Sequence, residues 1–262
     1  VFAFLFGPDE PKPTQLQKDR SLVRLIRARN GVLTSTELVE HTGLPLSDAE
    51  EEMGRLTGSY SGEPLVSDRG ELVYAFPELM TSAHAKLAVR EPKPAWLRLE
   101  YPKELTGNDK KSDTMIAAMN GFNLLAGLSA PALIFPRLGI GGPLAFLGLV
   151  AVPTVFSSIF FGLPLVRRWG LKRENKRRMK RNVRRLLIGL VYDRSVGAVR
   201  WISPADAERH VTPRLKGFEA TPRQITKELE KLANEFNADV EVEGDGTVRY
   251  RFPDIREAFV EG

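Results

Sequence analysis

The residues with the most evident chemistry are the cations of a short segment, 167–185. This segment holds eleven Lys or Arg residues and a single acidic residue, Glu174. The rest of the chain carries 27 basic and 32 acidic residues, so the net charge of +5 originates in this one stretch. Clustered cations bind phosphate groups, either of lipid headgroups or of nucleic acid. The sequence therefore predicts an anion-binding surface at one place in the chain.

Catalytic and metal-binding patterns are not evident. The three histidines, His41, His84 and His210, are far apart in the sequence and lack metal-ligand spacing. The chain has no cysteine, which excludes disulfides, thiolate metal sites and cysteine-bound iron–sulfur clusters. Phosphate-binding loops, dinucleotide fingerprints, zinc-protease motifs and nucleophile elbows are also missing from the sequence. We therefore predict no catalytic, cofactor-binding or metal-binding residues, and a protein that is not an enzyme.

A long apolar segment precedes the basic one. Residues 114–166 include one charged side chain, Arg137. Because a helix of about 20 apolar residues crosses a bilayer, we predict two transmembrane helices near 114–135 and 143–166. Prolines and glycines at 135–143 predict a turn between them. The alternative is a helical hairpin buried in a soluble core, although core helices seldom remain apolar on every side over this length.

The flanks of the apolar segment predict its orientation. Basic residues precede the first helix at Lys103, Lys110 and Lys111 and follow the second, and cytoplasmic flanks carry such an excess. We expect an integral protein of the inner or plasma membrane, with both soluble parts in the cytoplasm. The side chains expected to contact anionic lipid headgroups are Arg167, Arg168, Lys172, Arg173, Lys176, Arg177 and Arg178. A nucleic-acid tether is the alternative use of these cations.

Small and polar residues lie within the predicted membrane helices. Such residues mediate contact between helices in lipid, so we predict helix packing and a homo-oligomer. The residues expected at these contacts are Asn120, Asn123, Gly127, Ser157 and Ser158. A transport path is the alternative, but two helices without an intramembrane acid or base make a poor transporter.

Two strings in the sequence resemble each other. Residues 70–77 read G-x-L-x-Y-x-F-P and residues 246–253 read G-x-V-x-Y-x-F-P. A glycine-containing turn precedes each string, at 67–70 and 243–246, so each string predicts the second strand of a β-hairpin. Alternation places Leu72, Tyr74 and Phe76 on one buried face of the first strand.

Helices are predicted upstream of both hairpins. Capping boxes at 34–37, 47–50 and 221–224 each mark the start of a helix. The order helix, short helix, helix, hairpin is that of a winged helix, and it occurs twice. We predict an α+β fold with two winged-helix-like domains flanking a transmembrane helical hairpin. The expected segments are an apolar N-terminal segment 1–15, domain 16–82, linker 83–113, hairpin 114–166, basic helix 167–185 and domain 186–262. The apolar residues 1–6 predict a core strand or helix, or a short interfacial anchor.

The charges of the predicted domains argue against nucleic acid as a partner. The third helix of the first domain begins with Asp48 and Glu50–Glu52, which would repel phosphate. We therefore expect protein partners of unknown identity. The winged-helix-like domains would serve as protein-interaction modules.

Three stretches together resemble a known family: VFAFLFGP at 1–8, NGVLTSTEL at 30–38 and GELVYAFPEL at 70–79, followed by an apolar hairpin. The sequence resembles a poorly characterised family of membrane proteins from cyanobacteria, other bacteria and chloroplasts. Some plant members carry a label of iron–sulfur cluster biosynthesis. The resemblance implies a membrane-bound, non-secreted protein and brings no catalytic residues, and the chain has no thiolate for a cluster.

The leading functional hypothesis is a non-enzymatic integral membrane scaffold or adaptor that self-associates. The first alternative is a membrane-tethered DNA-binding transcription regulator. The second is an assembly factor or accessory subunit of a membrane complex.

Overall fold

The protein is described by a computed structural model that covers residues 2–8, 10–67, 70, 72–81, 91–197, 199–244 and 246–261. The chain forms two compact units. The first unit comprises residues 1–12 and 103–176, and the second comprises residues 13–102 and 177–262. One helix, α9 (Val152–Ser195), supplies residues to both units. The six segment boundaries expected from the sequence remain a prediction, because these units follow packing rather than chain order.

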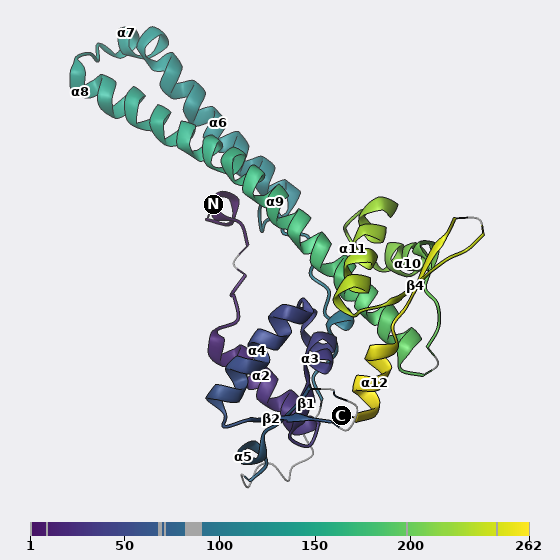
Figure 1. Cartoon of the computed structure of the whole chain (residues 1–262). Helices are drawn as coiled ribbons and strands as arrows, with labels where there is room; N and C mark the ends of the chain where they lie inside the picture. The colour runs from purple at the N-terminus through teal and green to yellow at the C-terminus, as the bar shows by residue number, and fades with distance from the viewer. Residues whose placement is uncertain are drawn as a thin grey trace. The chain divides into compact units, whose positions relative to one another are not determined.

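The first unit is built on a helical hairpin (Figure 1). In it, α6 (Lys110–Leu133) lies beside the beginning of α9. Between them come α7 (Phe135–Leu138), α8 (Pro143–Phe146) and a π-helix, η3 (Leu147–Ala151). Gly139 and Gly142 have φ of 63° and 93°, a region that favours glycine, and the chain reverses there. The turn predicted at 135–143 is therefore partly helical.

Two helical stretches in the described residues are long and apolar enough to cross a membrane. They are 110–133 and 143–195, whose most apolar 18-residue windows have mean hydropathies of 1.3 and 2.2, respectively. The stretches contain nearly all of the predicted spans, which were placed at 114–135 and 143–166. The π-helix was not predicted. It precedes Pro153, whose ring nitrogen cannot donate a hydrogen bond to the carbonyl of Leu149.

The N-terminal apolar residues form α1 (Phe2–Phe6), a short helix of the first unit. None of its residues is buried, so a core element is the wrong reading of this segment. The ring of Phe4 stacks on Phe160 with the centroids 4.9 Å apart, and the Arg167 guanidinium donates a hydrogen bond of 2.6 Å to the Leu5 carbonyl. These contacts hold α1 to the α9 portion of the first unit.

The second unit begins with a sequence of helices and a small sheet. Its elements are α2 (Gln15–Ala28), β1 (Val32–Thr34), α3 (Ser35–Thr42), α4 (Leu46–Ser59), β2 (Glu63–Val66), β3 (Leu72–Ala75), α5 (Pro77–Met80) and a 3₁₀ turn, η2 (Ala95–Leu97). The three strands pair antiparallel in the order β1-β3-β2. Tyr74 in β3 lies opposite Leu33 on one side and Pro64 on the other.

A second copy of this arrangement follows α9. Its elements are α10 (Pro204–Val211), a 3₁₀ turn η4 (Thr212–Arg214), α11 (Pro222–Glu235), β4 (Asp239–Val242), β5 (Val248–Arg251) and α12 (Pro253–Glu261). Ile202 takes the place of β1. It exchanges backbone hydrogen bonds of 2.8 and 3.0 Å with Tyr250, which lies in β5 as Tyr74 lies in β3. We call residues 13–81 the first copy and 200–261 the second copy.

The two copies share one hydrophobic core within the second unit. Buried members include Phe76 of the first copy, Phe252 of the second and Leu187 of α9. Arg184 on α9, 7% exposed, joins the copies. It donates hydrogen bonds to the carbonyls of Gly43 and Leu44 at 3.1 and 2.8 Å, and pairs with Glu235 at 2.7 Å.

Two of the three predicted capping boxes are confirmed. The side chains of Thr34 and Thr221 cap α3 and α11 in the predicted way. The capping box predicted at 47–50 is wrong, because α4 begins at Leu46 and its N-cap is Pro45. Proline has a φ already suited to helix entry, so the helix starts before Ser47. The Ser47 hydroxyl donates to the Asp48 carboxylate instead.

The predicted alternation along 72–76 is only partly correct. Val73, Tyr74 and Phe76 are buried, but Leu72 is 45% exposed. Leu72 pairs only with Val66 of β2, because β1 ends opposite Val73. The turns predicted at 67–70 and 243–246 include residues 68, 69 and 245, which lie outside the described residues, as does His84.

Candidate functional site

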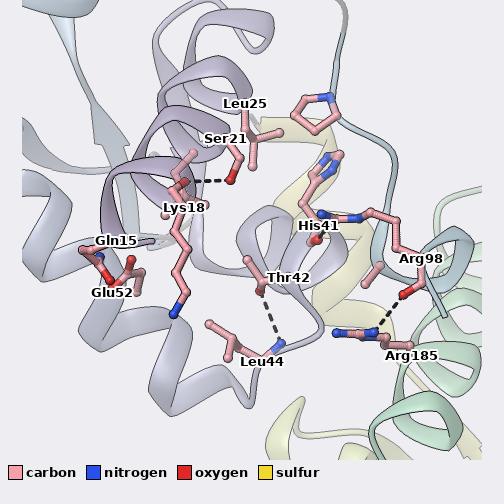
Figure 2. A pocket seen from close by; sticks show the side chains of 13 residues that line it. Gln15, Lys18, Ser21, Leu25, His41, Thr42, Leu44, Glu52, Arg98 and Arg185 are labelled. Atoms are coloured by element: carbon pink, nitrogen blue, oxygen red, sulfur yellow. Dashed lines mark hydrogen bonds between the residues drawn. The ribbon is translucent and has the colours of Figure 1, made fainter. Parts of the chain in front are cut away.

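A cavity of about 440 Å³ opens in the second unit, bounded by α2, α3, α4, residues 92–98 and α9 (Figure 2). This volume lies within the range of about 300–1,000 Å³ that is usual for small-molecule sites. Leu22, Leu25 and Ala95 form its apolar floor and are all buried. We call it the basic cavity, because Lys18, Arg98 and Arg185 also line it.

These three cations come from three different parts of the chain. Figure 2 shows Lys18 extending from α2, with Arg98 and Arg185 beside each other on the opposite side of the cavity. Lys18 and Arg98 are exposed, whereas Arg185 is partly buried. The Arg185 guanidinium donates a hydrogen bond of 2.8 Å to the Arg98 carbonyl, and the Arg98 guanidinium donates to the His41 carbonyl. The cations are therefore held partly by backbone oxygens.

Positive charge exceeds negative charge around the cavity. Arg185 pairs with Glu100 at 3.2 Å, but the same carboxylate also pairs with Arg181 at 2.7 Å and with Arg178 at 3.9 Å. Burial lowers the pKa of Arg185; Glu100 opposes this effect, and the charges of Arg98 and Arg181 add to it. Partial desolvation also lowers the pKa of Arg98, although this residue remains exposed. Both guanidiniums therefore lie where an additional anion would be stabilising.

His41, on α3, joins the basic cavity to a second polar group of residues. It is 3% exposed, and its Nε2 lies 3.1 Å from Glu91 Oε1 and 3.8 Å from Glu40 Oε2. Its Nδ1 is buried without a hydrogen-bond partner among the described residues. Burial lowers the pKa of His41, and the neighbouring Glu91 only partly opposes that shift. The imidazole is therefore neutral at pH 7.

Three carboxylates share one arginine beside His41. Arg29 pairs with Glu37 and Glu40 at 3.2 Å each and with Glu91 at 2.9 Å. Burial raises the pKa of Glu40 to about 7, and it also raises the pKa of Glu37. At Glu40 and Glu37 the effect of burial outweighs the charge of Arg29, so Glu40 keeps its proton up to about neutral pH. We call it the Arg29 cluster.

The chemistry of the basic cavity suits binding rather than reaction. Its two hydroxyl side chains are occupied: Ser21 donates to the Lys18 carbonyl at 2.6 Å, and Thr42 donates to the Leu38 carbonyl at 2.7 Å. Neither is paired with a base among the described residues. No group of three or more His, Asp or Glu side chains in the described part of the chain is placed to hold a metal ion.

The predicted helix-packing residues divide into two sets. Gly127 is buried against Pro153 and Thr154, and a Cβ at this glycine would lie 3.6 Å from each. Gly127, Asn123 and the buried Ser157 line a second cavity of about 520 Å³ in the first unit. Asn120 instead donates to the Ile116 carbonyl, and Ser158 is exposed.

The predicted lipid-contacting cations also divide into two sets. Arg167 and Arg178 are engaged by the Leu5 and Tyr101 carbonyls, respectively. The other five are exposed and form no ion pair within the described residues; they are Arg168, Lys172, Arg173, Lys176 and Arg177. These five are open to an external anion.

The basic cavity itself was not predicted. Lys18, Arg98 and Arg185 lie far apart in the sequence, and neither Lys18 nor Arg98 belongs to a motif. Only Arg185 lay within the segment that was singled out for its charge. The three side chains line one cavity because the tertiary fold brings α2, residues 92–98 and α9 around it, which is information that local sequence patterns do not contain.

Comparison with known proteins places the chain near an uncharacterised plant protein. A chloroplastic protein of Arabidopsis thaliana is 24% identical over 202 residues. The match covers 71% of this chain but only 39% of the length of that relative. This similarity is consistent with a poorly characterised family that has chloroplast members. No family model matches the chain, and no solved structure matches it.

Proposed function

We propose that this protein is a non-enzymatic membrane scaffold or adaptor. Its helical hairpin is the anchor in the bilayer, and its second unit recruits protein partners. The observation that carries the proposal is the exposure of large apolar side chains along α6, α8 and α9. Leu144 is 85% exposed, Val166 75% and Phe122 72%.

The energetics of these side chains favour a lipid surrounding. Burying one large apolar side chain is worth about 1.5–3 kcal/mol. The hairpin also exposes further large side chains that include Leu125, Leu128, Phe156 and Ile159. A continuous apolar surface of this kind is unfavourable in water, and it matches the thickness of a bilayer.

The flanking charges support an orientation in which both soluble parts are cytoplasmic. Lys110 and Lys111 open α6, and the exposed cations Arg168, Lys172 and Arg173 follow the second apolar stretch along α9. Each such cation near an anionic headgroup contributes about 1 kcal/mol. Basic flanks on both sides retain both ends of the hairpin in the cytoplasm.

The second unit offers surfaces suited to proteins. The order of helices and hairpin in the two copies supports winged-helix-like domains. In the first copy, α4 presents Asp48, Glu50 and Glu51 to solvent, where a DNA-reading helix would need cations. The strands β2 and β4 each lie at a sheet edge with exposed apolar side chains, such as Val66 at 70% and Val242 at 63%. Unpaired edges of this kind accept a strand from a partner.

The absence of cysteine allows a direct test of anchoring and orientation. Gly141→Cys places one thiol in the connection of the hairpin, where a Cβ meets no atom within 4 Å, and Arg223→Cys places one on the exposed start of α11. Intact spheroplasts would be treated with a membrane-impermeant maleimide. We expect Gly141→Cys to be labelled at once and Arg223→Cys only after lysis. Equal labelling of both before lysis, or recovery of the protein in the alkaline-soluble fraction, would contradict the proposal.

Gentle detergent extraction then tests the scaffold role. The full chain would be purified with its native contents, and the particle mass and composition would be measured. A homo-oligomer or a stable foreign protein supports the scaffold or adaptor. A monomer that binds duplex DNA at nanomolar concentration and releases it with salt would refute it in favour of a tethered regulator.

A further inference from the structure

We infer that the basic cavity binds a phosphomonoester with an apolar portion. Lys18, Arg98 and Arg185 would hold the phosphate, and the apolar portion would lie on Leu22 and Leu25. The inference concerns the second unit alone and stands independently of membrane anchoring.

The first argument is the unbalanced charge of the lining. Arg98 forms no ion pair within the described residues, and Arg185 shares the Glu100 carboxylate with Arg178 and Arg181. The acidic lining residue Glu52 is already engaged by Arg55 through hydrogen bonds of 2.7 and 2.9 Å. Cations gathered in this way around a concave surface attract an anion.

The second argument is an unsatisfied atom on a residue that lines the cavity. His41 lines the cavity, is nearly fully buried, and has an Nδ1 without a hydrogen-bond partner among the described residues. Buried polar atoms in folded proteins are almost always satisfied. Because the Nε2–H of the neutral ring faces the Glu91 carboxylate, Nδ1 is an acceptor, and it would take a hydrogen bond from a hydroxyl group of a ligand and not from an ionised phosphate oxygen.

The type of charge favours phosphate over carboxylate. Three cations from separate elements match a dianion, and a phosphate monoester carries a charge of about −1.5 to −2 at pH 7. Arginine provides a planar pair of donors that fits phosphate oxygens, and lysine adds a point charge. The cavity of about 440 Å³ accommodates a small molecule, and its buried leucines give an alkyl or aryl group an apolar surface.

Two sources share this chemistry. One is a soluble phosphorylated metabolite, and the other is a lipid whose headgroup is a phosphomonoester. The test must therefore present a free phosphate and the same phosphate on an acyl chain.

Tryptophan fluorescence provides the readout, because Trp96 lies in η2 next to the lining residue Ala95. The chain has three tryptophans, so replacement of Trp169 and Trp201 by Phe leaves Trp96 as the reporter. The full chain in non-ionic detergent would be titrated with inorganic phosphate, with dioctanoyl phosphatidic acid, and with dioctanoyl phosphatidylcholine as the apolar control. We expect a saturable change with the first two ligands and none with the third.

The variants assign that change to the cavity. Arg98→Gln and Lys18→Gln should each weaken binding by about tenfold or more, the usual cost of one charge-assisted hydrogen bond. Both side chains are exposed, so the folded state tolerates their loss. Arg223→Gln, an exposed cation of the same unit on α11, should bind as the parent does.

The relative affinities identify the source. Saturation by phosphatidic acid at concentrations at least about tenfold below those of inorganic phosphate indicates a lipid headgroup, and similar concentrations indicate a soluble phosphate. The inference is overturned if neither ligand gives a saturable change. It is also overturned if Arg98→Gln and Lys18→Gln both titrate like the parent.

Discussion

The two copies in the second unit use the same kind of cap at the start of a short helix. The pKa of the capping acid is nevertheless raised in the first copy and lowered in the second. In the first copy, Thr34 and Glu37 cap α3, and in the second copy Ser203 and Asp206 cap α10. Burial raises the pKa of Glu37 by more than Thr34 and Arg29 lower it. Burial also acts on Asp206, but the bonds from Ser203 and the charge of Arg209 outweigh it, and its pKa falls.

The difference arises from what surrounds each helix. The Glu37 side chain is 2% exposed and belongs to the Arg29 cluster, whereas the Asp206 side chain is 32% exposed. Three positions after the capping acid, α3 has Glu40, whose pKa is about 7. The same position in α10 is Arg209, a cation whose side chain is 77% exposed. The copies therefore share this cap and one core, but among the described residues the capping acid joins a group of carboxylates around an arginine in the first copy alone.

The largest expected effect on stability tests the hydrophobic core that the two copies share. Phe76 and Phe252 are 0% exposed and occupy matching positions. Phe76→Ala and Phe252→Ala should each lower the free energy of unfolding by about 3–5 kcal/mol, because each leaves a cavity in one common core. Chemical denaturation of the full chain in detergent measures both. Leu72→Ala, at a 45% exposed side chain, is the control and should cost far less. A small loss in only one phenylalanine variant would show that the copies do not share a core.

The second prediction tests the raised pKa of the carboxylates in the first copy, which is where the two copies differ. The folded-state pKa of Glu40 is about 7, above its ordinary value of 4.5, so the folded state binds the extra proton between these values. Stability contributed by this group is present below about pH 4.5 and is lost as the pH rises to 7. Relative to Glu40→Gln, the parent should lose about 2–3 kcal/mol between pH 4.5 and 8.

A matching variant in the second copy is a control for the pH dependence of stability. The charges of Arg29, Glu91 and Glu37 all act on Glu40, so the difference between parent and Glu40→Gln is the quantity to follow. Asp206→Asn should give the opposite sign, because the lowered pKa of Asp206 contributes stability that disappears as the pH falls below 3.8. Parallel pH profiles for parent and Glu40→Gln would refute a proton-binding Arg29 cluster.

The smallest effect concerns the caps themselves. Thr34→Ala and Ser203→Ala should each cost about 1 kcal/mol, since each removes a hydroxyl that accepts a helix-terminal N–H. Ser47→Ala should cost less than about 0.5 kcal/mol, because Ser47 caps nothing. Thermal unfolding of the three variants side by side is sufficient. A loss at Ser47 equal to that at Thr34 would mean that α4 begins later than residue 46.

The sequence was informative wherever a local pattern decides structure. Capping hydroxyls at Thr34 and Thr221, two apolar stretches and two hairpins all follow from residues within a few positions of one another. The sequence was uninformative where contacts between distant segments determine the structure. The exposure of Leu72 depends on where β1 ends, and the pairing of Ile202 with Tyr250 joins residues 48 positions apart. The basic cavity and the Arg29 cluster could not be predicted from the sequence for the same reason, because their members come from several elements. The start of α4 was misplaced for another reason, because two start signals competed and the proline preceded the serine.

The discontinuity of the second unit has a consequence for how the protein is made. Residues 103–176 separate its two parts in the chain. At roughly 5–20 residues per second, the ribosome needs several seconds to produce them. Throughout that interval Phe76 and Leu25 lack the α9 residues Leu186 and Leu187 that complete their core. The nascent first copy therefore remains open to chaperones and proteases until translation has passed the hairpin.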